Sequence, residues 1–223
     1  MANKLAAIRK ACRINDFAIA ATIKNFCKFK TERDVACFLN KQIRFSGAKL
    51  AFPTIVANSK HVFELHHKPC NTKLKRGFVV IDFGAKVAGW CSDVSRTIFI
   101  GVPTQKEIEL YKLVRKAQVA CVKMAKPNVL CSEIDHKAVL LLEKYSPNFI
   151  HAVGHGIGRE VHAKPAINSR SADRLQAGDV IAIEPGIYFK KKFGIRIEDT
   201  VLITRKAHEV LSQFPKKLIC INL

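Results

Sequence analysis

The fold is decided by the stretch Phe78-Val-Val-Ile-Asp82-Phe-Gly-Ala-Lys-Val-Ala-Gly-Trp-Cys-Ser-Asp93-Val-Ser-Arg-Thr97. Two apolar, β-branched runs flank a short connection in it, which is the pattern of a β-hairpin. If this hairpin folds about its midpoint near Val87, Asp82 faces Asp93 across the two strands. Directly opposed residues share a face, with Cβ atoms roughly 4.5–5.5 Å apart. The two carboxylates are therefore predicted to lie side by side.

A second pair of carboxylates lies in the same kind of pattern, in Ile181-Ala-Ile-Glu184-Pro-Gly and Gly194-Ile-Arg-Ile-Glu198-Asp. A hairpin folded about its midpoint near Lys191 places Glu184 opposite Glu198. Like charges repel at such distances, so four carboxylates on two strand pairs are favourable only with cations between them. Two divalent ions cancel the four negative charges.

A candidate fifth ligand, His155, lies between the two pairs, in the stretch His151-Ala-Val-Gly-His155-Gly-Ile-Gly-Arg-Glu-Val-His162. Three glycines around His155 argue against a helix, so this is not the helical His-Glu-x-x-His zinc motif. One or two imidazoles delivered by a loop or strand complete an oxygen-rich site. Such ligands suit manganese, iron or cobalt better than a structural tetrahedral zinc.

In order and spacing these motifs resemble the pita-bread metallopeptidases, the family of methionine aminopeptidases, aminopeptidase P, prolidase and creatinase. The resemblance runs from about Thr31 to Ile203. Asp93 follows Asp82 by eleven residues, and His-Gly-x-Gly, Glu-Pro-Gly and Arg-Ile-Glu-Asp come after them in the family order. The resemblance implies an α+β pita-bread fold with two pseudo-symmetric halves and a metal pair at their seam.

The resemblance also implies a role for each ligand. Asp82 chelates one metal ion and Asp93 bridges both, while His155 and Glu184 hold the other ion and Glu198 bridges. Two divalent ions are expected, manganese or cobalt first, with iron and zinc as alternatives.

Four further residues match the family positions that contact substrate or lie beside the site: His66, His151, His162 and Arg196. Two metals about 3.5–4 Å apart bind a bridging water, lower its pKa and polarise a carbonyl. Glu184, beside that water, is the candidate general base. His162 and His66, with His151 as a further catalytic candidate, are expected to hold the carbonyl oxygen as it gains charge.

The motifs favour the proline-directed branch of the family. Glu-Pro-Gly at Glu184, the arginine two residues before Glu198, and His151 four residues before His155 all resemble aminopeptidase P and Xaa-Pro dipeptidases. Removal of the N-terminal residue from peptides at Xaa-Pro bonds is the expected reaction. Methionine aminopeptidase activity remains an alternative, as does hydrolysis of a non-peptide C–N bond, as in creatinase.

Two residues and one domain depart from the family pattern. Ala163 stands where most relatives have Glu, so a partner that orients the site is predicted to be missing. Trp90 stands where Tyr is usual. We expect one catalytic domain over residues 1–223, without the N-terminal domain that proline-directed relatives carry, which puts the specificity in doubt.

The 223 residues carry a formal net charge of +20, and this charge has two interpretations. It indicates non-specific binding to nucleic acid or another anionic surface, or a lysine bias spread over solvated faces. A non-catalytic pita-bread module with a basic surface is the competing function class, and retention of all five ligand residues argues against it.

Several properties are expected from length and composition. The chain has no apolar run of about 18 residues and no signal peptide, so we expect a cytoplasmic protein with peptide substrates and no membrane partner. Monomer and homodimer both stay open. Eight cysteines without a Cys-x-x-Cys pair are expected to be reduced. His61, His136 and His208 are expected to be structural.

The pattern also predicts the local elements. The first thirty residues suit one or two helices, and a capping box at Thr31 opens another helix that Gly47 ends. Thr104 opens a long amphipathic helix, and Ser132 caps a helix that ends near Tyr145. Strands are predicted over residues 51–56, 63–65, 79–81, 97–100, 180–183, 195–198, 201–204 and 218–221.

Overall fold

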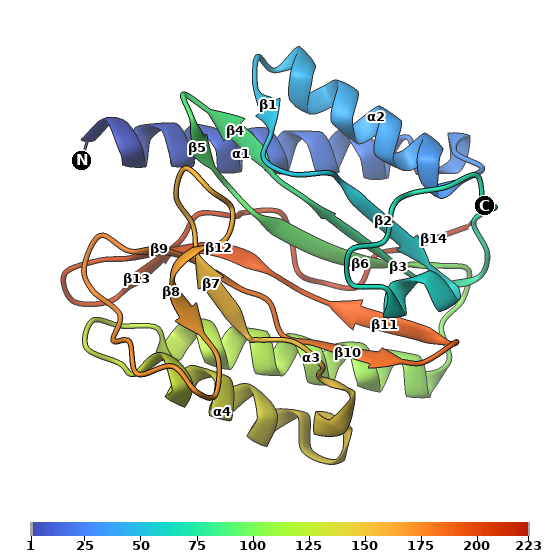
Figure 1. The fold of residues 1–223 in the computed structure, drawn as a ribbon. Helices are drawn as coiled ribbons and strands as arrows, with labels where there is room; N and C mark the ends of the chain where they lie inside the picture. The colour runs from blue at the N-terminus through green and yellow to red at the C-terminus, as the bar shows by residue number, and fades with distance from the viewer. Residues whose placement is uncertain (1, 223) are drawn as a thin grey trace.

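The computed structural model describes residues 2–222, and Figure 1 shows one pair of long helices, in blue, along the upper side of the strands and a second pair, in green to yellow, along the lower side. The helical elements are α1 (Ala2–Lys24), η1 (Phe26–Lys28), α2 (Glu32–Phe45), η2 (Ser59–Phe63), α3 (Gln105–Met124), α4 (Cys131–Leu142) and η3 (Glu143–Asn148). Helix α1 packs against α2, and α3 packs against α4. The predicted helices at the N-terminus, after Thr31 and after Thr104 are confirmed, and both capping boxes form.

The strands form two larger sheets and two small ones. The first larger sheet has the order β14-β6-β3-β2, and the second has the order β13-β12-β9-β7-β8. The bounds are β1 (Lys49–Leu50), β2 (Ile55–Asn58), β3 (Gly77–Phe83), β4 (Ala85–Val87), β5 (Trp90–Cys91), β6 (Val94–Ile100), β7 (Gly154–Gly156), β8 (Ala163–Ile167), β9 (Val180–Ile183), β10 (Gly186–Phe189), β11 (Phe193–Arg196), β12 (Asp199–Ile203), β13 (His208–Val210) and β14 (Cys220–Ile221).

The two halves repeat one arrangement, as predicted. Two helices precede three antiparallel strands in each half: β2, β3 and β6 in the first, and β7, β9 and β12 in the second. A small hairpin, β4–β5 or β10–β11, interrupts the last strand pair of each half. The α+β fold class and the duplicated halves are therefore confirmed.

Separate apolar clusters lie under the helices of each half, and a third cluster joins the halves. Helices α1 and α2 cover the first sheet through residues such as Ile19 and Leu39. Helices α3 and α4 cover the second through Cys121 and Ile134. In the joining cluster Phe78 of β3 packs with residues of α3 and β11. The sheets are thereby held as one body, with their ends facing each other at the seam.

The hairpin register differs from the prediction in the first half. Asp82 pairs with Ser95, and the turn lies at Ala88 and Gly89, whose φ angles are 48° and 82°. Two consecutive positive φ angles match a type I′ turn, which suits a two-residue hairpin loop. The predicted pairing of Asp82 with Asp93 is therefore wrong by two residues. Side chains alternate with a period of two, so Asp93 still points to the face of Asp82.

The second hairpin agrees with its prediction. Its turn is centred on Lys191, and the pairs Gly186–Arg196 and Ile183–Asp199 lie on either side of Glu184 and Glu198. Residues 184 and 198 therefore lie level with each other at the junction between β9–β12 and β10–β11.

Three local predictions are wrong. The strand predicted over residues 51–56 forms only at its end, because β1 stops at Leu50 and β2 begins at Ile55. Residues 63–65 form no strand, because η2 and a turn lie there. Helix α4 begins two residues earlier than predicted, at Cys131 with Leu130 as its N-cap, so Ser132 does not cap it. The Asp135 side chain instead accepts a hydrogen bond from the backbone N–H of Val153, at 3.0 Å. It thus fastens the chain shortly before His155.

No helix among residues 2–222 is both long enough and apolar enough to cross a membrane.

Candidate active site

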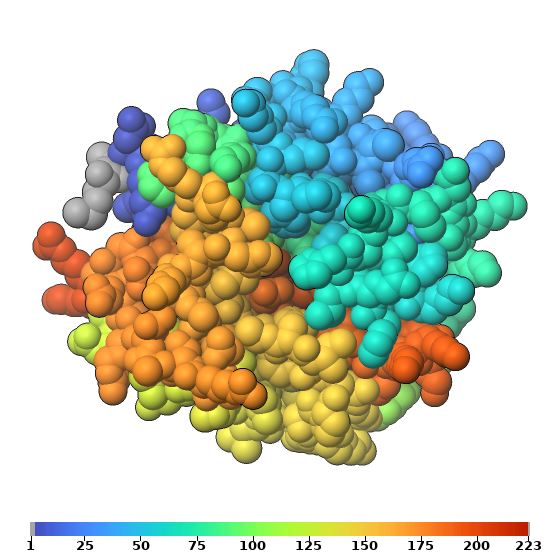
Figure 2. Space-filling view, in the orientation of Figure 1, coloured from blue at the N-terminus to red at the C-terminus, as the bar shows by residue number. Residues whose placement is uncertain are grey.

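A cavity of about 650 Å³ opens at the seam between the two halves. Figure 2 shows a hollow in this face, between the cyan-to-teal segment and the yellow-to-orange segment. The cavity is lined by residues of both halves, among them Phe52, Leu65, His66, Asp82, Asp93, His151, His155, Val161, His162, Glu184 and Arg196. The predicted site residues thus meet in one place, and only Glu198 lies below the lining.

The four predicted carboxylates occupy equivalent places in the two halves. Asp82 lies near the end of β3, and Glu184 directly follows β9. Asp93 directly precedes β6, and Glu198 directly precedes β12. Each side chain is therefore held where a strand meets its interrupting hairpin, on the side that faces the other half.

Three of these carboxylates carry a buried oxygen without a hydrogen-bond partner among the described residues: Asp82 Oδ1, Asp93 Oδ1 and Glu198 Oε1. A buried carboxylate oxygen without a partner loses its hydration and gains nothing in exchange. Three of them at one point form a set of free acceptors for cations.

His155 brings a nitrogen to the same point. Its strand, β7, runs between β8 and β9, where a Cβ on Gly154 would meet the carbonyl oxygen of Ala182 at 2.0 Å and one on Gly156 would meet that of Lys164 at 2.0 Å. Only glycine beside His155 permits this close approach, which explains the His-Gly pattern. The ring Nδ1–H donates to the Gly156 carbonyl oxygen at 3.1 Å. The lone pair on Nε2 is therefore free to bind a metal ion.

The distances around Nε2 suit shared metal ligation. His155 Nε2 lies 3.6 Å from Asp93 Oδ2 and 3.5 Å from Glu184 Oε1. Ligand atoms of Asp93, His155 and Glu198 all lie within 4.8 Å of one another. Bonds of roughly 2.0–2.2 Å to one ion separate its ligand atoms by roughly 3–3.5 Å. These residues therefore fit a divalent metal ion.

Burial and mutual repulsion disfavour the charged forms of these acids, and a bound cation would favour them. Burial, with the charge of Glu198 next, raises the pKa of Asp93 well above its usual range. Burial and the charge of Glu184 do the same to the pKa of Glu198. Burial raises the pKa of Glu184 to about 8. Burial lowers the pKa of His155, so its ring is neutral.

Arg196 is buried and fully engaged beside the carboxylates. Its guanidinium donates to Asp82 Oδ2 at 2.5 Å, to Ser95 Oγ at 3.0 Å and to the Tyr188 hydroxyl oxygen at 2.8 Å. Although burial lowers its pKa, Tyr188 and Asp82 outweigh that effect, and the pKa is raised. Arg196 therefore orients Asp82 and compensates part of its charge.

His151 is held neutral by its surroundings. Its Nδ1–H donates to the Ala152 carbonyl oxygen at 2.7 Å, so Nε2 accepts from the Tyr188 hydroxyl at 2.8 Å. Burial, with Arg196 next, lowers the pKa of His151 to about 3. Both ring nitrogens are thus used within the protein, and His151 contacts the cavity through its ring.

The other two histidines differ from His151 because they are exposed. His66 and His162 line the cavity from opposite halves of the chain. The His162 ring packs edge-on against the His155 ring, with 4.5 Å between the centroids. Their nitrogens are thus available to a molecule in the cavity.

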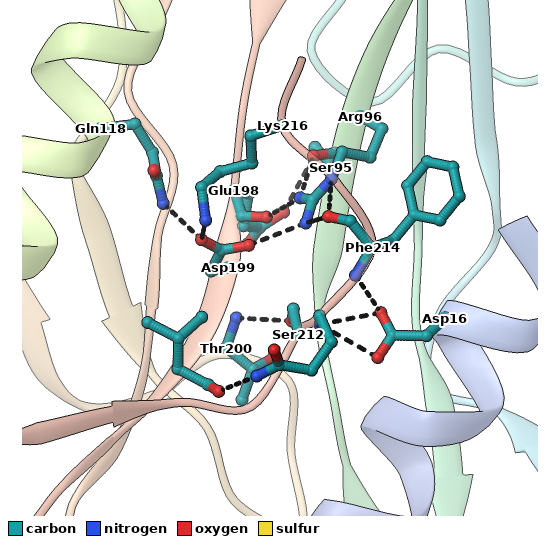
Figure 3. A network of polar contacts seen from close by, with 12 residues as sticks. Asp16, Ser95, Arg96, Gln118, Glu198, Asp199, Thr200, Ser212, Phe214 and Lys216 are labelled. Atoms are coloured by element: carbon teal, nitrogen blue, oxygen red, sulfur yellow. Dashed lines mark hydrogen bonds and ion pairs between the residues drawn. The ribbon is translucent and has the colours of Figure 1, made fainter. Parts of the chain in front are cut away.

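Behind the cavity, a second polar network holds the backbone of Glu198 in place (Figure 3). Arg96 donates to the Glu198 carbonyl oxygen and to Asp199 Oδ1, the latter at 2.9 Å. Asp199 Oδ2 accepts from Gln118 at 2.9 Å and from Lys216. Asp199 is completely buried, so the adjacent Glu198 cannot move far from the site.

Sequence reasoning missed the supporting residues Tyr188, Ser95, Arg96 and Thr200. Ser95 donates to Glu198 Oε2 at 2.8 Å. Thr200 exchanges hydrogen bonds with the backbone of Asp93, at 2.6 and 3.1 Å. A signal was present, because Ser95 and Thr200 are polar residues within apolar strand runs, each two residues from a predicted ligand.

Comparisons with known proteins agree with this geometry. Residues 6–205 match the model of metallopeptidase family M24. An Xaa-Pro dipeptidase of Pyrococcus furiosus is 40% identical over 216 residues, which are 95% of this chain and 62% of that protein. The chain thus spans less than two thirds of the length of this curated relative.

Solved structures show the same architecture. Prolidase from Pyrococcus furiosus superposes with a TM-score of 0.91 at 38% identity, over 96% of this chain and 64% of that one. An X-Pro aminopeptidase from Thermotoga maritima gives a TM-score of 0.95 at 34% identity, over 99% and 64% of the two chains. The pita-bread fold that the motifs imply is confirmed, and the chain belongs to metallopeptidase family M24.

Proposed function

We propose that this chain is the catalytic part of a dinuclear metallopeptidase that removes the N-terminal residue of peptides at Xaa-Pro bonds. The observation that carries the proposal is the convergence of three unpartnered buried carboxylate oxygens and the free Nε2 of His155 on the floor of one cavity. The dipeptidase and aminopeptidase relatives support the reaction class.

The ligand roles follow the equivalence of the two halves. Asp93 and Glu198 are the most deeply buried of the four carboxylates, and we propose that they would be the ligands shared by two divalent ions. Asp82 belongs to one ion, and His155 and Glu184 to the other. We propose manganese or cobalt for both ions, because the ligands are mainly carboxylate oxygens. The ions supply an activated water and polarise the scissile carbonyl group.

The remaining chemistry is assigned to the side chains of the chain itself. Glu184 is placed to accept the proton of the attacking water, since its carboxylate lines the cavity. His66 and His162 donate hydrogen bonds to the carbonyl oxygen as its charge develops. Phe52, Leu65 and Val161 form an apolar wall that suits a proline ring.

Xaa-Pro bonds need such a dedicated site, because they lack the amide N–H and because proline fixes its φ angle. Methionine aminopeptidase activity is less well supported, because the relatives reported above are named as an Xaa-Pro dipeptidase and an X-Pro aminopeptidase. Retention of all five ligand residues opposes a non-catalytic module.

The test is turnover of a peptide panel by the metal-free chain with Mn²⁺, Co²⁺ or Zn²⁺ added back. Xaa-Pro and Xaa-Pro-Yaa peptides should be cleaved with Mn²⁺ or Co²⁺, and chelation should abolish the activity. Asp93→Asn is the matched inactive control. Cleavage of Met-Ala-Ser without any Xaa-Pro cleavage would reject the specificity, and no cleavage of any peptide by metal-loaded protein would reject the reaction.

A further inference from the structure

A second group of metal-ligating side chains lies outside the carboxylate site. We call it the wall cluster, and it consists of Glu32, His61, His67 and Cys70. Each of the four offers one ligand atom, and these atoms all lie within 4.8 Å of one another. His67 also lines the catalytic cavity, together with its neighbours His66 and Lys68. The wall cluster therefore lies directly behind the cavity wall that carries His66.

The wall cluster is centred on a completely buried carboxylate, Glu32, at the first position of α2. Glu32 Oε1 lies 2.9 Å from His61 Nδ1, and Oε2 lies 2.8 Å from His67 Nε2 and 3.3 Å from Cys70 Sγ. No lysine or arginine among residues 2–222 pairs with Glu32. Only groups that are neutral or ionisable near pH 7 therefore surround its charge.

The contacts of His67 point to a cation more directly. Its Nε2 faces Glu32, and its Nδ1 lies 3.0 Å from Glu64 Oε2. A protonated imidazole would donate to both carboxylates, whereas a neutral imidazole carries one N–H and presents a lone pair to one carboxylate oxygen. A metal ion on Nε2 removes this conflict, because Nδ1–H then donates to Glu64. A carboxylate behind a metal-bound histidine is a recurrent arrangement.

We propose that the wall cluster is a second metal site, separate from the catalytic pair, that takes a zinc-type divalent cation. One thiolate, two imidazoles and one carboxylate are four ligands of the types that bind zinc in proteins, and four is the usual number in a tetrahedral zinc site. Thiolate and carboxylate together carry the two negative charges that balance the ion. The soft sulfur distinguishes this set from the oxygen-rich catalytic one, which suits harder metals.

The spacing permits the ion with a small local adjustment. Bonds of roughly 2.0–2.3 Å in a tetrahedral site separate the ligand atoms by roughly 3.3–3.7 Å. The contacts of Glu32 in the wall cluster are 2.8, 2.9 and 3.3 Å, so they must widen by several tenths of an ångström. The stacked rings of His61 and His67, with centroids 4.4 Å apart, must also tilt so that their lone pairs converge.

A cation there ties three segments together: the start of α2, the helix η2 and the turn that leads to Cys70. His66 lies between two of the ligands in sequence, so its backbone position is fixed from both sides. A cation in the wall cluster would therefore hold the cavity wall that carries His66 in place. It would do so without any change in the catalytic ligands.

Cobalt alone, added to the reduced, metal-free full chain, is the probe for the site. The catalytic cavity is not lined by a cysteine. Among the described residues, the wall cluster is the group of potential metal ligands that contains one, so thiolate-to-cobalt charge-transfer absorption in the near ultraviolet reports on the wall cluster. We expect this absorption to saturate at one equivalent of cobalt, in addition to two equivalents bound without it. Zinc should remove the absorption by displacement.

Cys70→Ser should abolish the absorption and one equivalent of bound metal while leaving the other two. His61→Asn should weaken cobalt binding at the wall cluster at least tenfold and serves as a second variant if Cys70→Ser folds poorly. Cys37→Ser, an exposed cysteine on the same helix α2, is the matched control and should change nothing. The proposal is overturned if folded protein with two bound equivalents shows no thiolate absorption, or if Cys37→Ser removes it. Because the readout is spectroscopic, the test of the wall cluster does not depend on peptidase activity.

Discussion

Glu198 and Asp199 are adjacent, acidic and completely or almost completely buried, yet the protein treats them in opposite ways. Every oxygen of Asp199 is used: Arg96 binds Oδ1, and Gln118 and Lys216 bind Oδ2. Glu198 receives one hydrogen bond, from Ser95 to Oε2, and its Oε1 has no partner among the described residues. Successive residues of an extended chain point to opposite faces, so one acid faces the helices and the other faces the cavity.

Of these two neighbouring acids, Asp199 therefore serves the stability of the fold and Glu198 serves the site. A buried charge that is paired and hydrogen-bonded contributes to a fixed structure, whereas its removal leaves the partners uncompensated. A buried charge without partners is unfavourable until a ligand arrives. The Asp199 network thus stabilises the backbone that presents the unfavourable Glu198 carboxylate.

The largest effect is expected from Glu198→Gln. Loss of a ligand proposed to be shared by both ions should lower metal affinity by more than roughly 100-fold, which is more than the loss of a residue behind a ligand costs. Peptidase activity should fall with it. Asp82→Asn should lose less metal, because Asp82 serves one ion. Elemental analysis and kcat/KM measure the two effects, and full metal content in Glu198→Gln would reject the bridging role.

Asp199→Ala should have the opposite profile. Removing one partner of a buried charged network typically costs about 3–5 kcal/mol of unfolding free energy. Denaturant unfolding should therefore show a large loss of stability, while the folded fraction still binds two metal ions. Asp173→Ala, at an acid that lies exposed near the surface, is the control and should be neutral. Equal stability of Asp199→Ala and the parent would contradict the comparison.

His162→Ala should separate catalysis from metal binding. One donor to a developing oxyanion is commonly worth ~10²–10³ in kcat. Metal content should not change, because the ring of His162 packs against His155 without ligating. An unchanged kcat would show that His162 does not contribute to catalysis. That outcome matters because Ala163, beside it, stands where most relatives have Glu.

The unpaired carboxylates also predict a pH dependence in metal-free protein. Burial raises the pKa of Glu184 to about 8 from an ordinary value near 4.5. Between these two values the folded chain binds more protons than the unfolded chain, so stability falls as pH rises. The Tm of chelator-treated protein should fall between pH 5 and 8, relative to protein with Mn²⁺. Glu184→Gln should flatten this difference, and parallel pH profiles with and without metal would count against it.

Tyr188→Phe should give the smallest effect. It removes the hydroxyl that links Arg196 to His151, and a buried donor left without its acceptor costs about 1–3 kcal/mol of stability. Asp82 should keep its metal, because Arg196 still holds it through another nitrogen. Tyr145→Phe, outside the cavity lining, is the control for thermal unfolding. A loss of metal from Tyr188→Phe would mean that the hydroxyl orients Asp82.

The sequence predicted the carboxylates of the site better than the residues that hold them in place. Asp82, Asp93, Glu184 and Glu198 are recognisable because each lies at the edge of an apolar run, and a two-residue register error kept them on one face. Arg96 and Lys216 could not be assigned to Asp199, since 103 and 17 residues separate them from it. Such pairs depend on how the two halves close, which local periodicity does not encode.

Local prediction also failed where tertiary contacts decide the backbone. Residues 63–65 have the composition of a strand, but the neighbouring histidines bind Glu32 and bend the chain into a turn. Ser132 has the composition of a cap, but the helix begins at Cys131, whose backbone N–H donates to the Asp173 carbonyl oxygen. In both places a partner distant in sequence overrides the preference of the segment.

The hydrogen bonds of Arg96 to the C-terminal segment limit where this chain can be truncated. Its guanidinium also donates to the Phe214 carbonyl oxygen, and Lys216 completes the Asp199 network, so Phe214 and Lys216 take part in the buried network although the family match ends at residue 205. A truncation guided by the family boundary would expose the back of Glu198 to solvent. Expression trials should therefore keep the C-terminal segment to at least Ile221, whose strand pairs with β6.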